Sequence, residues 1–247
     1  ITPADPPVVV YLLGNSTVCD QPVEPYASWG QMLTAFFEPD VVIANHAESG
    51  ASYRSALSRG RVDKIMSLMH PGDYLLLQFG HNDMKQQGKG IGPYTSFRSE
   101  IIQCVEETRK RGGHPVLITP CQRLNFDGQG RIVNSHGDYP DAVRQVAEVW
   151  KVPLIDLHEM SARLYEAIGP QEASRLFALP AERTHHNNYG SYQLAKCIAE
   201  GIRQNRLGIA RFLQDDLPVY DPSHPDPPAS WVFPESPLGS LVQPDGS

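Results

Sequence analysis

The fold class is decided by the run Val8-Val9-Val10-Tyr11-Leu12-Leu13, which is followed directly by Gly14-Asn15-Ser16-Thr17. A continuous run of β-branched and apolar residues that ends at a glycine is typical of a parallel strand buried on both faces. Similar runs predict further strands at 41–44, 74–79, 116–119 and 152–155. The sequence therefore predicts a central parallel sheet of about five strands.

The segments between these runs have helical periodicity. Apolar residues recur three or four positions apart in 97–108, 143–150 and 192–202, as they do on the buried face of a helix. Asp138 is expected to cap the second helix, and Asn187 or Asn188 the third, which Gly208 would end. Alternating strands and helices indicate an α/β fold with helices on both faces of the sheet.

The 247 residues fit one domain, predicted at 1–210, and a proline-rich C-terminal tail, predicted at 211–247. Eight of the last 30 residues are proline, a density that a packed helix or a central strand does not tolerate. The tail is either an extended strap over the domain or a linker. Trp231, Val232 and Phe233 favour the strap, because they offer apolar contacts.

Composition excludes several classes of function. The net charge of −7, without a dense run of Lys or Arg, argues against a nucleic-acid partner. No apolar run is long enough to predict a membrane span, and the first residues, 1–7, lack the pattern of a signal peptide. The cysteines form no CxxC pair, and buried free thiols are favoured over disulfides for Cys19, Cys104, Cys121 and Cys197.

Polar segments follow the predicted strands, where ligands bind in open α/β sheets. These segments are 14–17, 45–50 and 80–83, and a fourth, 182–185, precedes the last helix. We expect all four to meet at one rim of the sheet.

The four segments together favour acyl transfer by a serine. Ser16 is the candidate nucleophile and His185 the candidate base, with Glu182 three residues earlier, on the same helical turn, to orient the imidazole. The backbone N–H of Gly50, the amide of Asn82 and the N–H of Ser16, at a helix start, are candidate donors to an oxyanion.

Each residue alone has a commoner explanation, such as a helix cap, a turn or a solvated histidine, and it is their joint occurrence that favours catalysis. The neighbouring His186 does not indicate a metal, because no HExxH pattern is present. A polar rim would suit sugar hydroxyls, and its candidate members are Gln31, Glu48, Arg54, His81, Lys85 and Gln122.

These blocks resemble the SGNH (GDSL-like) hydrolase superfamily and, within it, the rhamnogalacturonan acetylesterase family. The similarity spans about residues 8–210 and is carried by Tyr11–Thr17, by Asn45–Gly50 with 58–61, by Gln78–Asp83 and by Thr184–His185. The block 78–83 is the most specific of them.

The resemblance implies a flavodoxin-like three-layer sandwich and a secreted or periplasmic esterase without a cofactor or metal. Its substrate would be an acetylated plant cell-wall polysaccharide of the pectin or rhamnogalacturonan type. By position, Ser16 would be the nucleophile, Glu182 and His185 would complete the triad, and Gly50 and Asn82 would complete the oxyanion hole. Asn15 and His81 would support the site.

Two residues depart from the family pattern. Asn15 stands where the family usually has Asp, and Glu182 replaces another Asp. Our hypothesis is that Asn15 reduces or retunes the activity without changing the chemistry. A lower esterase rate in Asn15→Asp would refute it.

Two alternatives stay open. One is a general acyl-ester hydrolase of the lipase or thioesterase kind, and the other is a catalytically impaired carbohydrate-binding relative. A Rossmann enzyme is disfavoured because no GxGxxG follows the first strand, and a G-x-S-x-G hydrolase is disfavoured because that motif is absent.

Overall fold

The structure is a computed structural model that describes residues 7–229 and 231. Its centre is a parallel sheet of five strands in the order β2-β1-β3-β4-β5, which is the flavodoxin-like order. The strands are β1 (Val8–Gly14), β2 (Val41–Asn45), β3 (Tyr74–Gln78), β4 (His114–Ile118) and β5 (Leu154–Ile155). The predicted α/β fold and parallel sheet are confirmed. The fifth strand is shorter than the predicted 152–155, because only its last two residues pair with β4.

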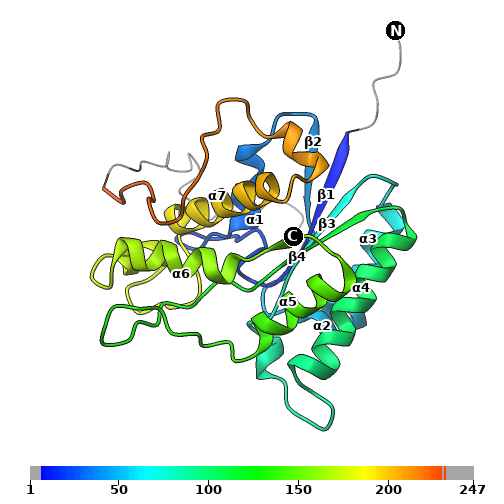
Figure 1. Cartoon of the computed structure of the whole chain (residues 1–247), viewed down its shortest axis with the longest axis horizontal. Helices are drawn as coiled ribbons and strands as arrows, with labels where there is room; N and C mark the ends of the chain where they lie inside the picture. The colour runs from blue at the N-terminus through cyan, green and yellow to red at the C-terminus, as the bar shows by residue number, and fades with distance from the viewer. Residues whose placement is uncertain (1–6, 230, 232–247) are drawn as a thin grey trace, which may run out of the picture.

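Helices cover both faces of the sheet (Figure 1). One layer contains α2 (Tyr53–Ser58), α3 (Arg61–Leu68), α4 (Arg98–Lys110) and α5 (Tyr139–Trp150). The other contains α1 (Trp29–Met32), α6 (Leu157–Ile168) and α7 (Asn188–Gln204). Short 3₁₀ or π turns occur at Leu33–Phe36, Asp83–Lys85, Pro93–Phe97, Ala173–Leu176 and Gly208–Phe212.

Alternation along the strands explains why the apolar runs are continuous. In β1, Val10 and Leu12 belong to the core under α1, α6 and α7, whereas Tyr11 and Leu13 belong to the core under α2 to α5. Successive side chains of a strand point to opposite faces, so a strand covered on both sides must be apolar at every position.

The helix ends agree only partly with the predictions. Asn187 caps α7, and its side chain accepts a hydrogen bond from the Gly190 N–H at 3.0 Å. Asp138 occupies the N-cap position of α5 without making a side-chain cap bond. The prediction for Gly208 is wrong: α7 ends at Gln204, and Gly208 begins a separate 3₁₀ turn.

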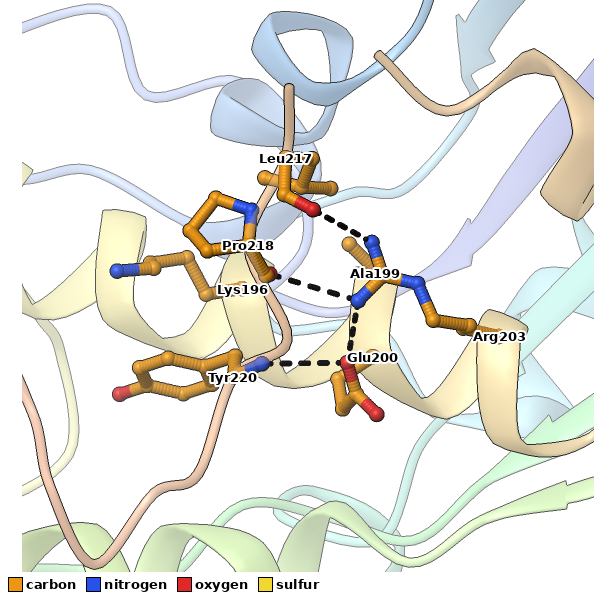
Figure 2. A pocket seen from close by; sticks show the side chains of 7 residues that line it. All are labelled: Lys196, Ala199, Glu200, Arg203, Leu217, Pro218 and Tyr220. Carbon is orange, nitrogen blue, oxygen red and sulfur yellow. Dashed lines mark hydrogen bonds and ion pairs between the residues drawn. The ribbon is translucent and has the colours of Figure 1, made fainter. Parts of the chain in front are cut away.

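The first part of the proline-rich tail packs against α7 (Figure 2). The Tyr220 side chain is buried, and its backbone N–H donates to Glu200 Oε2 at 3.2 Å. Arg203 donates to the carbonyl oxygen of Leu217 at 3.0 Å. Further along, Lys196 forms an ion pair with Asp226 at 2.8 Å. The described part of the tail is therefore an extended segment held on the domain surface, as a strap would be.

Trp231 contacts the rings of Tyr189 and Tyr192 on α7, with centroid separations of 5.5 and 5.7 Å. The other two proposed contacts of the tail, Val232 and Phe233, lie outside the described residues. All four cysteines are buried and free, as predicted. Among residues 7–229 and 231, no helix is both long enough and apolar enough to span a bilayer.

Candidate active site

Three loops at the carboxyl ends of β1, β2 and β3 are joined by hydrogen bonds. The Glu48 N–H donates to the Gly14 carbonyl at 3.1 Å, which ties the β2 loop to the β1 loop. Asn82 Nδ2 donates to the Ala51 carbonyl at 3.0 Å, which ties the β3 loop to the β2 loop. The three segments therefore meet at one rim, as the sequence predicted.

Ser16, His185 and Glu182 form a linked row of side chains. The Ser16 Oγ lies 2.9 Å from His185 Nε2. On the other side of the imidazole, His185 Nδ1 lies 3.3 Å from Glu182 Oε2. A hydroxyl, an imidazole and a carboxylate in this order, each within reach of the next, can activate the hydroxyl as a nucleophile.

The local backbone of this row differs from the prediction in two places. Glu182 and His185 do not share a helical turn, because α7 begins only at Asn188. Ser16 does not start a helix, because it lies in a single turn closed by the Val18 and Cys19 N–H groups on the Asn15 carbonyl. The row is built from two turns, and each turn is held by its own short-range hydrogen bonds.

The Glu182 carboxylate organises the turn that carries His185. Its Oε1 accepts the N–H groups of Arg183, Thr184 and His185 at 2.9, 2.8 and 3.3 Å, which leaves Oε2 to face the imidazole. Burial raises the pKa of Glu182, but the Thr184 N–H, the His185 side chain and the other two N–H groups outweigh it, so the pKa lies below its usual value. Glu182 is therefore held as a carboxylate.

A buried chain of hydrogen bonds supports the Ser16 turn from below. Trp29 Nε1 donates to Gln78 Oε1, and Gln78 Nε2 donates to Thr17 Oγ1 at 2.7 Å. The Thr17 hydroxyl and N–H both donate to Asn15 Oδ1, at 2.9 and 3.0 Å. Sequence reasoning missed Thr17, Gln78 and Trp29. The available signal was Gln78, a polar residue in an otherwise apolar buried strand.

Asn15 is fully buried, and its Nδ2 has no hydrogen-bond partner among the described residues. Its oxygen already accepts two hydrogen bonds from Thr17. A neutral amide at this position avoids the cost of burying a charge. The effect of Asn15 on activity stays a prediction.

Three N–H groups at this rim are available to a ligand. Within the described part of the chain, the backbone N–H groups of Ser16 and Gly50 donate to no acceptor. Gly50 has a φ of +78°, and a Cβ there would meet nothing within 4 Å, so the residue is glycine because of its backbone conformation. Asn82 uses one amide hydrogen on Ala51, and its Oδ1 accepts from Lys85 Nζ at 2.9 Å.

Asp83 holds two of these loops together, a role that the sequence did not reveal. Its buried carboxyl accepts the Tyr53 N–H and the Gly80 N–H, both at 2.9 Å. Burial raises the pKa of Asp83 to about 6, although the two N–H groups oppose this shift. Asp83 therefore fixes the segment that carries Asn82 relative to the start of α2.

The predicted polar rim is only partly present. His81 and Gln122 are buried, with exposures of 2% and 4%, so their assignment to the rim is wrong. His81 instead contacts the ring of His136, with a centroid separation of 4.5 Å. The other four predicted residues have a protein partner: Gln31 accepts from Gln21, Glu48 pairs with Arg59 and Arg61, Arg54 pairs with Glu100, and Lys85 donates to Asn82.

The histidines beside the row are buried without a charged partner. Burial lowers the pKa of His136 and His186 to about 3 and that of His158 to about 4, so these rings are neutral near pH 7. His186 is bonded to the Tyr165 hydroxyl at 2.7 Å, so it belongs to the core and not to the catalytic row. Within residues 7–229 and 231, no group of three or more His, Cys, Asp or Glu side chains is placed to hold a metal ion.

An open pocket of about 290 Å³ lies against the row. Its lining residues are Ser16, Gln21, Tyr26, Ser49, Glu182 and His185. Both Ser16 and His185 therefore face a space that a small ligand can enter.

The comparisons with known proteins identify the class. Residues 12–192 match the model of the GDSL-like lipase/acylhydrolase family. The chain belongs to this family. It is a carboxylic ester hydrolase.

The similar proteins include esterases of one named activity. The chain is 41% identical over 225 residues to rhamnogalacturonan acetylesterase RhgT of Bacillus subtilis, covering 85% of this chain and 94% of that protein. It is 32% identical over 214 residues to a rhamnogalacturonan acetylesterase of Emericella nidulans, covering 78% and 84%. The crystal structure of the YxiM protein of Bacillus subtilis superposes with a TM-score of 0.76 at 26% identity, covering 82% of this chain and 58% of that one.

Proposed function

We propose that this protein is a serine esterase that removes acetyl groups from a pectin-like plant cell-wall polysaccharide of the rhamnogalacturonan type. The observation that carries the chemistry is the Ser16–His185–Glu182 row beside an open pocket. The named activity of relatives at 41% and 32% identity supports the substrate. Since such a polymer lies outside the cell, the proposal implies a secreted or periplasmic enzyme.

The first half of the reaction forms an acetyl-enzyme. Neutral His185 Nε2 takes the Ser16 proton as Oγ attacks the acetyl carbonyl carbon, and Glu182 stabilises the imidazolium that results. The negative charge that develops on the carbonyl oxygen is met by the free N–H groups of Ser16 and Gly50 and by the Asn82 amide. Protonated His185 then gives its proton to the leaving sugar oxygen, and the C–O bond of the ester breaks.

The second half releases acetate. His185 takes a proton from a water molecule, the hydroxide attacks the acetyl carbonyl, and the same N–H groups hold the second oxyanion. When the intermediate collapses, His185 returns its proton to Ser16 Oγ. His185 thus accepts a proton and gives it back in each half, and it ends the cycle as it began.

Acetate release from acetylated rhamnogalacturonan and from p-nitrophenyl acetate tests the proposal, with Ser16→Ala as the control. Release by the parent protein and not by the variant is the expected result. Release from p-nitrophenyl acetate but not from the polysaccharide would refute the substrate. No release from either would refute the chemistry and leave the carbohydrate-binding alternative.

The pocket also bears on the alternative of a lipase or thioesterase. Apart from Tyr26, its lining side chains are polar, whereas sites for long acyl chains are lined mainly by apolar side chains. We therefore expect the rate to fall from acetyl to octanoyl esters of p-nitrophenol, and a rise along that series would favour the alternative.

A further inference from the structure

The pocket beside Ser16 is lined by one aromatic side chain, Tyr26, which the triad chemistry does not use. The other lining residues contribute hydroxyl, amide, carboxylate and imidazole groups. The Tyr26 ring stands almost perpendicular to the His185 imidazole, with a centroid separation of 6.0 Å and an interplanar angle of 79°. An aromatic side chain therefore lies beside the imidazole of the proposed base and lines the same pocket.

Tyr26 is not explained by core packing. It is partly exposed and belongs to neither hydrophobic core cluster of the described residues. Within the described part of the chain, its hydroxyl has no hydrogen-bond partner. A large ring kept half in solvent next to a catalytic row, with an unused hydroxyl, is available for contact with a ligand.

The backbone around Tyr26 is nevertheless held in place. The Tyr26 N–H donates to the Val23 carbonyl at 3.2 Å, and the next residue, Ala27, donates its N–H to the His186 carbonyl at 2.8 Å. Ala27 and His186 form an isolated antiparallel bridge. The residues that follow Tyr26 and His185 are thus bonded to each other, which sets the backbone of Tyr26 relative to that of His185.

Two polar side chains line the same pocket as the ring and can bind hydroxyls. Gln21 Nε2 donates to the Ser16 carbonyl at 2.6 Å, and among the described residues Gln21 Oε1 has no donor. Ser49 lines the same pocket on an exposed part of the β2 loop. A flat apolar ring bordered by hydrogen-bonding groups matches a pyranose, which has apolar C–H faces and a rim of hydroxyls.

We propose that Tyr26, with Gln21 and Ser49 beside it, forms a subsite for the pyranose ring that carries the acetyl ester. The sugar stacks on the Tyr26 ring while its acetyl carbonyl reaches Ser16. The subsite rests on the proposed function, because it supposes that the ester belongs to a sugar. It accounts for selection of a sugar ester by a site whose catalytic row would hydrolyse any accessible acetyl ester.

Acetate release from acetylated rhamnogalacturonan and from ethyl acetate, which has no ring to stack, tests the subsite. For Tyr26→Ala we expect KM on the polysaccharide to rise about five- to tenfold, so that the loss of kcat/KM on the polysaccharide exceeds any loss on ethyl acetate by that factor. Tyr26→Phe should retain the parent values on both substrates, because the ring and not the hydroxyl makes the contact. Tyr94→Ala removes another exposed tyrosine, on the opposite helical layer, and should change neither.

Two results would overturn the subsite while leaving the proposed function intact. Equal losses on both esters would mean that Tyr26 only positions His185. Polysaccharide kinetics of Tyr26→Ala equal to those of the parent would mean that the ring contacts no sugar. Failure of the proposed function is distinguishable, because the parent protein itself would then release no acetate from the polysaccharide, and the subsite would fall with it.

Discussion

Replacing Glu182 by glutamine tests whether the carboxylate sets the tautomer of the His185 imidazole. In the structure, Glu182 Oε1 accepts three backbone N–H groups, and Oε2 faces His185 Nδ1 at 3.3 Å. In Glu182→Gln the amide oxygen must stay on the three N–H donors, since turning the amide would leave those donors facing an NH₂ group. The NH₂ group is therefore directed at the imidazole.

The expected loss follows from the tautomer. An NH₂ group facing Nδ1 requires Nδ1 to be an acceptor, so the proton moves to Nε2, which then cannot take the Ser16 proton. The same change of acid to amide lowers turnover about 10⁴-fold in a serine protease triad. The 3.3 Å contact here is longer than an ordinary charge-assisted hydrogen bond, so we expect a loss of about 10³- to 10⁴-fold in kcat. Since the three N–H bonds persist, the free energy of unfolding should change by less than about 1 kcal/mol.

The assay is steady-state hydrolysis of p-nitrophenyl acetate, together with thermal unfolding of each variant. Glu182→Asp is the matched control, because it retains the charge with a side chain one methylene shorter, and it should keep activity within about tenfold of the parent. A Glu182→Gln rate within tenfold of the parent would refute the reasoning and direct attention to another acceptor for Nδ1. If Glu182→Gln lost activity and its unfolding temperature also fell well below that of the parent, Glu182 would be shown only to hold the turn.

Three further predictions concern other parts of the chain. Asn82→Ala removes a proposed oxyanion donor and should lower kcat about 10²- to 10³-fold, measured on p-nitrophenyl acetate; a loss below threefold would exclude that role. The stability contributed by neutral His136, His158 and His186 is fully present above about pH 6.5 and is lost as the pH falls toward their folded-state pKa values of about 3, 4 and 3. Each costs about 1.4 kcal/mol per pH unit in that window, whereas the raised pKa of Asp83, about 6, acts in the opposite direction as a single group. The unfolding temperature of the parent should therefore be lower at pH 5 than at pH 7, and this difference should be smaller for His136→Leu. An equal difference in the two proteins would contradict the assignment. Tyr220→Phe removes the 2.9 Å bond to Gln193 Oε1 and should cost about 1 kcal/mol in urea unfolding without changing esterase activity; an unchanged midpoint would show that this bond contributes nothing to stability.

The strand positions and the candidate catalytic residues were predictable from the sequence alone. A strand covered on both faces must be apolar throughout, so runs such as 8–13 and 74–77 are visible without a structure. Ser16, Gly50 and Asn82 directly follow such runs or their loops, and the carboxyl ends of parallel strands share one edge. The residues that meet at the rim could therefore be predicted from their positions just after the strands.

The residues that support the site were not predictable in the same way. Gln78 and Asp83 bond to partners 61 and 30 positions away in the chain. Tyr26 matters because the fold places it in the lining of the pocket. Periodicity and spacing report only neighbours along the chain. The burial of His81 and Gln122 was likewise missed, because a polar residue just past a strand can point either to solvent or into the layer of helices.

The sequence by itself determined the α/β class, the parallel sheet and the identity of the residues brought to its edge. The reason is that apolar runs and strand–helix alternation are local patterns with few packed solutions. Only the tertiary structure decided that Ser16 Oγ lies 2.9 Å from His185 Nε2 and that Tyr26 borders the pocket. Those facts depend on contacts between turns up to 169 residues apart, and such distances are set by how the two helical layers close over the sheet.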